Sequence, residues 1–371
     1  MTAGIIQENR SDKAAKGNRE AQRLPSLDGW RAISIIMVLV AHSTGLAGFP
    51  KGWIKTTCLI FDGHLGVRFF FVISGFLITY LLIREHDQHG LINLKNFYLR
   101  RGLRILPVYG AYLLGVVILE LVTNLHQTGF TWFCNVTFLT NFIPNSSGWI
   151  TAHLWSLSVE EQFYLLWPLS LVWLLKMNRR WLCMALAMPI LIAIITHVFA
   201  FLHCFPWILR SLFQPRSSFV NFDSLDIGCM AAFVFAWYEM ECRAFLKKER
   251  RWLAILFGIL LIVSAQFFWG VAVVFSGVLQ SLGFAVLLLA SILFPLAFRF
   301  LNWAWVQWLG TLSYSIYIWQ QIFCAAPDNY GCTSIWWMTF PYWIVPAILT
   351  AIVSYYGLER PLLRLRARYR R

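Results

Sequence analysis

The stretch Leu27–His42, LDGWRAISIIMVLVAH, places an aspartate and an arginine at the start of a nearly unbroken apolar run and a histidine at its end. A run of this kind is typical of a helix in lipid. An α-helix has 3.6 residues per turn and rises 1.5 Å per residue, so the step from Arg31 to His42 is about three turns, or roughly 16 Å along one face. We therefore expect both side chains to point to the same side of the helix.

The composition of the whole chain agrees with this stretch. Hydrophobic residues make up 59% of the 371 residues and charged residues only 13%, whereas a soluble domain has roughly 45–50% apolar residues. A chain of this length can hold two soluble domains, but here the apolar runs divide it into spans of about 20 residues, the length that crosses a bilayer as a helix. We predict an integral, multi-pass membrane protein with no separate soluble domain.

Lys and Arg outnumber Asp and Glu by 31 to 17, a formal net charge of +14. In a soluble chain this excess raises the question of nucleic acid. Here the basic residues lie in short clusters between apolar spans and near both ends of the chain, as the positive-inside bias predicts for cytoplasmic loops. We therefore expect membrane lipids and not nucleic acid as partners, with cytoplasmic basic tails at 1–23 and 364–371 around a transmembrane domain at 24–363.

The predicted fold is all-α, a polytopic membrane bundle of about ten transmembrane helices with both termini in the cytoplasm. The segment 130–144 is apolar but too short to cross, and it carries polar residues. It predicts a re-entrant or interfacial piece on the outer side, with an eleventh span as the alternative. The ten expected spans lie near 30–47, 65–84, 106–124, 157–175, 181–201, 220–238, 252–269, 275–298, 305–325 and 336–356.

The eight cysteines form no C-x-x-C pair and no Cys/His cluster at metal-ligand spacing, so we expect no metal site. Most of them lie inside apolar runs, where a cysteine is a small core residue. Cys324 and Cys332 flank the loop APDNYG, and they can form a disulfide if that loop faces an oxidising compartment. The pattern leaves this pairing open.

His42 and a pair of arginines are candidates for chemistry. His42 ends the first expected span on the outer side and is either an interfacial histidine at a helix end or a general base. Arg101 and Arg104 lie three residues apart at the entrance to the third span, so they point the same way. Guanidinium groups bind phosphate bidentately, and the pair suits a phosphorylated ligand that arrives from the cytosol; anchoring at the cytoplasmic surface is the alternative.

The fourth expected span begins with two adjacent glutamates. Ser158 and Glu161 have the spacing of a capping box, which gives Glu161 a structural role at the start of a helix. Glu160 has no such role. An acidic residue inside a span is costly unless it is paired or hydrated, so Glu160 is a candidate functional residue.

Three further polar residues are open to simple structural explanations. Ser74 lies in a small-residue stretch that favours close packing of helices over a nucleophile, because no G-x-S-x-G motif surrounds it. Asp223 and Asp226 open the sixth expected span. They either line an outer vestibule or cap the helix.

Six stretches in order resemble the membrane acyltransferase-3 family of integral membrane O-acyltransferases, over about residues 24–363. They are LDGWRAISIIMVLVAH, LGVRFFFVISGFLIT, RGLR, WSLSVEEQFYLLWP, YSIYIWQQ and YYGLERP. The resemblance implies transfer of an acyl group, usually acetyl from acetyl-CoA. It ties Arg31 and His42 to catalysis, and Arg101 and Arg104 to the CoA donor. Many relatives carry Asp where this chain has Arg68, which leaves an acidic role at that position in doubt.

The resemblance leads to a definite functional hypothesis. An acyl-CoA docks from the cytosol on the arginine pair, and His42 acts as general base on a hydroxyl of a carbohydrate or another extracytoplasmic or lipid-linked acceptor. An acyl-histidine is a variant of this route. Arg31 stabilises charge near the donor or orients the first helix.

The expected location is the plasma or inner membrane of a bacterium. The chain lacks the esterase-like C-terminal domain of some members, so we expect transfer to finish in the membrane part. A transporter or flippase for a lipid-linked glycan is the rival function, since ten spans with buried polar groups suit it equally, although no inverted repeat is detected. A purely structural role as a membrane scaffold is the third and least favoured function.

Overall fold

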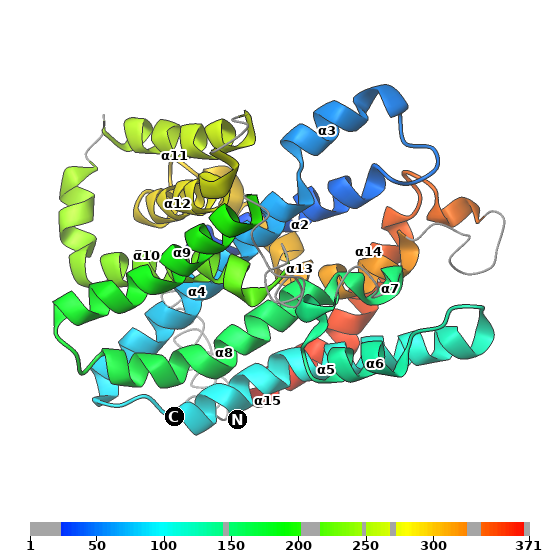
Figure 1. Cartoon of the computed structure of the whole chain (residues 1–371), viewed down its shortest axis with the longest axis horizontal. Helices are drawn as coiled ribbons and strands as arrows, with labels where there is room; N and C mark the ends of the chain where they lie inside the picture. Colours follow the sequence, from blue (N-terminus) through cyan, green and yellow to red (C-terminus); the bar gives the residue numbers. More distant parts are fainter. Residues whose placement is uncertain are drawn as a thin grey trace, which may run out of the picture.

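The computed structural model describes residues 24–143, 148–201, 216–246, 250–267, 272–324 and 335–366. The regular elements in these ranges are all helical, which confirms the predicted all-α class (Figure 1). The long helices are α2 (Leu27–Ser43), α4 (Gly63–His89), α5 (Leu94–Val122), α8 (Leu154–Leu174), α9 (Arg179–Phe201), α10 (Ser218–Phe245), α11 (Arg250–Phe267), α12 (Ala272–Leu293) and α13 (Ala304–Phe323). The shorter elements are η1 (Lys51–Trp53), α3 (Ile54–Ile60), α6 (Gly129–Val136), η2 (Thr140–Phe142), α7 (Trp149–Ala152), η4 (Arg299–Asn302), η6 (Trp336–Met338), α14 (Ile344–Ser354), the π-helical η7 (Tyr355–Glu359) and α15 (Arg360–Arg366).

Local signals in the sequence explain the turn between α4 and α5. Gly90 follows α4 with a φ of 72°, a left-handed conformation that glycine adopts without strain. Three residues later, the side chain of Asn93 caps α5 by accepting a hydrogen bond from the backbone amide of Asn96 at 3.0 Å. This turn therefore reverses the chain sharply, and α5 starts well before the arginine pair.

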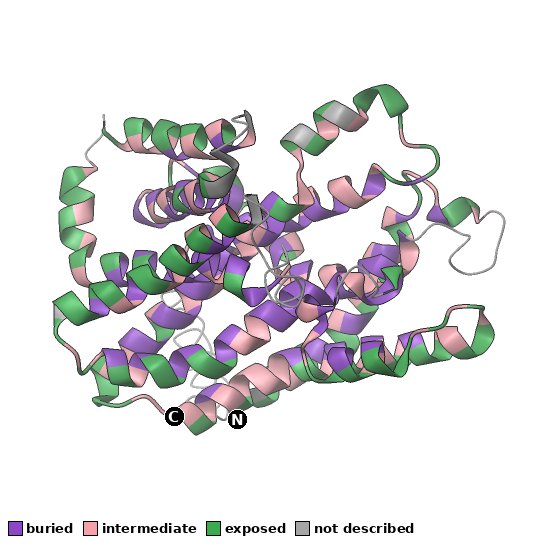
Figure 2. Cartoon of the chain, viewed as in Figure 1, coloured by how far each residue is buried: buried purple, intermediate pink, exposed green. Residues whose placement is uncertain are grey.

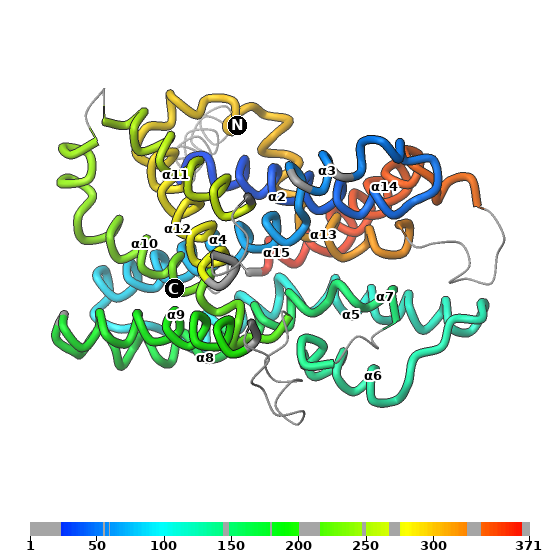
Figure 3. Tube along the Cα trace, turned by 45° about the horizontal axis from the view of Figure 1, so that its top comes forward, coloured from blue at the N-terminus to red at the C-terminus, as the bar shows by residue number. Residues whose placement is uncertain are grey.

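The helix α4 lies inside the bundle and packs against α2, α10 and α12. On its other side α2 packs against α13, which in turn contacts α14 (Figure 3). The contact between α4 and α10 is backbone to backbone: a Cβ atom on Gly75 would lie 1.9 Å from the carbonyl oxygen of Leu225, and one on Gly228 would lie 2.2 Å from that of Val72. Small residues allow this close approach, which drives helix association in lipid.

Two hydrophobic clusters meet along α2 and α4. One is formed largely by α2, α4, α5, α8 and α13, and the other by α2, α4, α10 and α12. Figure 2 shows buried residues concentrated on the inward faces of these helices, while exposed residues lie on the outside. Many exposed side chains are large and apolar, such as Leu165, Leu191 and Phe257, as expected for surfaces that face lipid.

Five helices in the described part are long and apolar enough to cross a membrane: Thr56–His89, Leu94–Val122, Arg180–Phe199, Ser218–Phe245 and Phe275–Leu293. The protein is therefore an integral membrane protein. Two of the remaining long helices, α8 and α13, contain 21 and 20 residues, but glutamates, glutamines and serines lower their apolar content. Ten crossings and the orientation of the termini stay predictions.

Several expected boundaries are corrected. The third expected span starts near 106, and the helix that contains it, α5, begins earlier, at Leu94, so the arginine pair lies within the helix. The last expected span starts near 336, but its helix begins at Ile344 and continues through the π-helical turn to Arg366, into the expected C-terminal tail. The segment 130–144 contains the eight-residue α6 and the turn η2, and so makes no eleventh crossing. The N-terminal tail, residues 367–371 and Cys332 lie outside the described residues.

Candidate functional site

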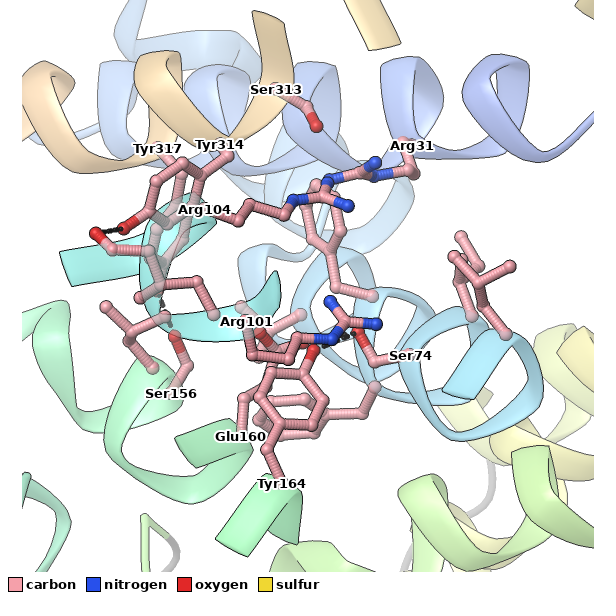
Figure 4. Close-up of a pocket in the computed structure, with 17 residues that line it drawn as sticks. Arg31, Ser74, Arg101, Arg104, Ser156, Glu160, Tyr164, Ser313, Tyr314 and Tyr317 are labelled. Carbon is pink, nitrogen blue, oxygen red and sulfur yellow. Dashed lines mark hydrogen bonds between the residues drawn. The ribbon is translucent and has the colours of Figure 1, made fainter. Parts of the chain in front are cut away.

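A cavity with an empty volume of ≈ 770 Å³ lies between α2, α4, α5, α8 and α13 (Figure 4). We call it the arginine cavity, because Arg31, Arg101 and Arg104 all line it. Its other polar lining residues are Ser74, Ser156, Glu160, Tyr164, Ser313, Tyr314 and Tyr317. Four of the five candidate residues that the sequence indicated therefore line one cavity. They come from three helices and are Arg31, Glu160, Arg101 and Arg104.

Helical spacing explains which side chains reach this cavity. Ser156, Glu160 and Tyr164 lie four residues apart on α8, which puts them on one face one turn above another. Arg101 and Arg104 share a face of α5 in the same way. In Figure 4 Arg31 enters from α2 and its guanidinium group points toward that of Arg104.

Ser74 is part of the cavity wall and does more than pack. Its hydroxyl donates a hydrogen bond of 2.7 Å to Oε1 of Glu160 and accepts one of 3.1 Å from the hydroxyl of Tyr164. The neighbouring Gly75 makes the close helix contact that the small-residue stretch predicted. The expected packing role belongs to Gly75, and Ser74 holds the carboxylate of Glu160 in place.

The arginines of this cavity lack carboxylate partners. Within the described ranges, none of the three guanidinium groups has a carboxylate oxygen within 4.0 Å. Arg101 stacks on the ring of Tyr164, with its guanidinium carbon 4.7 Å from the ring centroid. Three cations that face one cavity without ion pairs favour a ligand with several negative charges, such as a polyphosphate.

The predicted capping box is wrong. The helix α8 starts at Leu154, four residues before Ser158, and no side chain caps it. The hydroxyl of Ser158 donates to the carbonyl oxygen of Leu154 inside the helix. Glu161 therefore has no capping role, and its Oε1 is buried without a hydrogen-bond partner in the described part of the chain.

His42 lies in a second cavity, which also has an empty volume of ≈ 770 Å³. We call it the histidine cavity, because His42, His64 and His153 line it together with Asp62, Trp149, Trp155, Arg216, Tyr317 and Gln321. Nδ1 of His42 is 3.3 Å from the side-chain oxygen of Gln320. With this amide oxygen as the acceptor, the contact corresponds to the tautomer of His42 that carries the proton on Nδ1 and the lone pair on Nε2.

The two cavities are neighbours on one face of α2. Val67 and Tyr317 line both of them and so lie between them. Arg31 faces the first cavity and His42 the second, as their spacing of about three turns predicts. The five candidate residues therefore fall into two groups, and His42 does not share a cavity with the arginines.

Several residues near the site carried no signal of their own in the sequence. Gln320, Tyr164 and Tyr317 lie in stretches that looked aromatic or amphipathic, and nothing in those stretches shows which side chain faces a cavity. Glu359 is also buried, and it accepts a hydrogen bond of 2.9 Å from Ser315. Its position directly after an apolar, tyrosine-rich run is the sequence signal that could have identified it, because an acidic residue in such a segment needs a partner.

In the described part of the chain, no group of three or more His, Cys, Asp and Glu residues is arranged to hold a metal ion. The three histidines around the second cavity are not such a group. The polar side chains that line the two cavities are of the types that take part in acid–base chemistry and anion binding.

The fold and the two cavities define a class of protein: an integral membrane protein whose helices enclose a cationic cavity beside a histidine-bearing one. Comparison with known sequences gives the family. A family model described as an acyltransferase domain matches residues 24–359. The chain belongs to this acyltransferase family, as its six sequence stretches predicted.

Its relatives are named as O-acetyltransferases. The chain is 28% identical over 326 residues to the peptidoglycan O-acetyltransferase OatA of Listeria monocytogenes, a match that covers 80% of this chain and 49% of that protein. It is 26% identical over 375 residues to YrhL of Bacillus subtilis, provisionally named a peptidoglycan O-acetyltransferase, with 91% and 55% covered. A provisionally named O-acetyltransferase of Staphylococcus aureus is 34% identical over 171 residues, 42% of this chain and 26% of that protein.

The chain spans about half the length of OatA and YrhL. No solved structure gives a significant match.

Proposed function

We propose that this protein is an O-acetyltransferase of a bacterial plasma or inner membrane. It moves an acetyl group from acetyl-CoA to a hydroxyl of a carbohydrate or another extracytoplasmic or lipid-linked acceptor. The family and the names of the relatives support acetyl transfer to a cell-wall glycan. The arginine cavity supports a donor that carries several phosphates.

The observation that carries the proposal is the position of the two cavities on one helix. Through α2, Arg31 reaches the arginine cavity and His42 the histidine cavity, with Val67 and Tyr317 between them. A donor held by its phosphates in the first cavity can extend a thin arm past these two side chains. The pantetheine arm of CoA is long, narrow and only modestly polar, and it ends in the thioester.

The reaction moves one proton in two transfers, from the acceptor hydroxyl to His42 and from His42 to the sulfur of CoA. Nε2 of His42 takes the proton of the acceptor hydroxyl while the hydroxyl oxygen attacks the thioester carbonyl carbon. The new C–O bond forms, the C–S bond breaks, and CoA leaves as a thiolate that takes up the proton from His42. Gln320 holds the ring with Nδ1 protonated, and an acyl group carried briefly on His42 is the variant route.

The remaining candidate residues act on the donor side. Arg101 and Arg104 bind the phosphates, and Arg31 offsets negative charge near the thioester or orients α2. Glu160, held by Ser74 at 2.7 Å, accepts hydrogen bonds from the amide groups of the pantetheine arm. In this arrangement Glu160 also balances part of the positive charge when no donor is bound.

The test is the substitution His42→Ala in purified protein, with transfer of radiolabelled acetyl from acetyl-CoA to a glycan acceptor as the measurement. Loss of the general base is expected to lower turnover by about 10²–10⁴-fold, with membrane insertion unchanged. His89→Ala is the matched control, because His89 is exposed at the far end of α4. Near-normal turnover in the His42 variant rules out the general-base role.

A transporter or flippase for a lipid-linked glycan is not favoured, because the relatives are named for acetyl transfer. The same purified protein distinguishes the two functions. A transferase incorporates label into the acceptor in detergent, where no membrane separates two compartments. A flippase moves a lipid-linked glycan in sealed vesicles and incorporates no label.

A further inference from the structure

A third cavity, with an empty volume of ≈ 760 Å³, lies between α4, α9, α10, α11 and α12. We call it the Arg68 cavity. Its polar lining consists of Asp62, His64, Arg68, His197, Asn221, Gln266, Ser276 and Gln280, and Trp155 forms an aromatic part of the wall. These residues serve no step of the reaction described above.

The Arg68 cavity continues the histidine cavity. Asp62, His64, Val67 and Trp155 line both. A ligand with its reacting group at His42 can therefore extend past His64 and Trp155 into the Arg68 cavity without leaving the protein.

Arg68 is fixed at the inner wall of this third cavity. Its Nη1 lies 3.6 Å from Oδ2 of the fully buried Asp223 and donates to the hydroxyl of Ser224 at 3.3 Å. On the opposite side its guanidinium group rests on α12, where a Cβ atom on Gly277 would lie 2.4 Å from Nη1. Asp223 is therefore neither a helix cap nor a free vestibule carboxylate, and it neutralises Arg68.

This charge balance distinguishes the Arg68 cavity from the arginine cavity. In the described part of the chain, the three guanidinium groups of the arginine cavity have no carboxylate oxygen within 4.0 Å, so that cavity suits phosphates. The charge of Arg68 is paired with Asp223, so the Arg68 cavity suits a neutral ligand with many hydroxyl groups. Gln266 and Gln280 add amide groups that both donate and accept. His197 also lines this cavity, and its Nε2 is buried with no hydrogen-bond partner among the described residues.

We propose that the histidine and Arg68 cavities form one acceptor cleft for an oligosaccharide. The sugar unit with the reacting hydroxyl occupies the histidine cavity, Trp155 offers an apolar surface to the ring faces, and the next sugar unit binds at Arg68, Gln280 and His197. This inference rests on the proposed acetyl transfer and adds to it a minimum length for the acceptor. A monosaccharide then occupies only the histidine cavity, makes no contact in the Arg68 cavity, and is a poor acceptor.

The experiment measures kcat/KM for acetyl transfer to N-acetylglucosamine and to chitotetraose, a linear tetramer of the same sugar. The expected ratio of tetramer to monomer is roughly tenfold or more, the value of one hydrogen bond to a charged group. In Arg68→Gln the ratio falls toward one. In Arg84→Gln, the same change on the same helix but outside all three cavities, it stays at the wild-type value.

A second variant guards against a folding defect. Gly277→Ala keeps the charge of Arg68, and the atoms nearest to its new methyl group are those of the guanidinium end of that side chain. The guanidinium group moves while the helices stay in place, so the ratio is again expected to fall, at an unchanged melting temperature in detergent.

The outcomes separate the two proposals. No transfer to either saccharide by the wild-type protein contradicts a saccharide acceptor, and with it both the oligosaccharide cleft and the carbohydrate form of the proposed function. Transfer to both with equal kcat/KM, or a ratio that survives Arg68→Gln, overturns the oligosaccharide cleft and leaves acetyl transfer standing.

Discussion

At the scale of single residues, the three arginines of the arginine cavity bear on the proposed donor side. Arg101 and Arg104 sit one turn apart on α5 and line this cavity, and Arg101 also lies over the rings of Tyr164 and Phe97. Half-buried cations without a close carboxylate partner cost free energy, and a bound polyphosphate lowers that cost. Affinity for the donor should therefore depend on this pair far more than the chemical step does.

Replacing Arg101 and Arg104 together by Gln is expected to raise KM for acetyl-CoA by at least tenfold, with a much smaller change in kcat. The physical reason is that charge-assisted hydrogen bonds to phosphate are lost while His42 keeps its place. Initial rates at varied donor concentration provide the measurement.

Arg100→Gln is the control for this pair. Arg100 is adjacent on α5 but is paired with Glu85 at 3.1 Å, outside the arginine cavity. If KM for the donor holds in the double variant and only KM for the acceptor rises, the arginines belong to the acceptor side.

At the scale of elements, the contact of α4 with α10 positions both sides of the site. The helix α4 carries Ser74 into the arginine cavity and Arg68 into the Arg68 cavity, and α10 carries the partner Asp223. The backbones touch at Gly75 and Gly228. A small change in their separation therefore moves residues of two cavities at once.

Gly75→Ala is expected to lower the stability of the folded protein by about 1–3 kcal/mol, the usual cost of overpacking. The added methyl group meets the backbone of Leu225, which cannot move aside as a side chain can. The melting temperature in detergent measures the effect. Gly110→Ala is the control, because nothing lies within 4 Å of the added atom on α5, and its melting temperature should stay the same or rise slightly.

At the scale of the whole molecule, the proposed reaction brings donor and acceptor together from opposite ends of α2. A hydrocarbon core is about 30 Å thick, and the step from Arg31 to His42 covers roughly 16 Å of it. The two cavities with Val67 and Tyr317 between them shorten the path that the pantetheine arm must follow. Entry of the donor from the cytosolic side is thus a prediction about topology as well as mechanism.

Cysteine labelling tests that path. On a background without the eight native cysteines, a single cysteine in place of His42 is expected to react with a small thiol reagent. A non-hydrolysable analogue of acetyl-CoA, supplied from the cytosolic side of sealed vesicles, should protect it.

A cysteine in place of His89, exposed at the far end of α4, should react equally with and without the analogue. Protection from the outer side alone, or none at saturating analogue, means that His42 and the donor do not share a passage.

The sequence alone determined the helices and the faces of single helices. Apolar runs of about 20 residues specify helices in lipid because the backbone must satisfy its own hydrogen bonds there. The spacing of Arg31 and His42, or of Arg101 and Arg104, places each pair on one face because helical periodicity is local. The six family stretches, read in order, indicated the acyltransferase family that the comparison confirmed.

The tertiary structure alone decided which faces meet. Rotation and separation of packed helices depend on contacts between distant residues, such as Gly75 with Leu225, and no local pattern encodes them. For this reason the place of Tyr317 between the two cavities, the hydrogen bond from Ser74 to Glu160, and the pairing of Arg68 with Asp223 could not be read from the chain. In each case the partner lies on another helix.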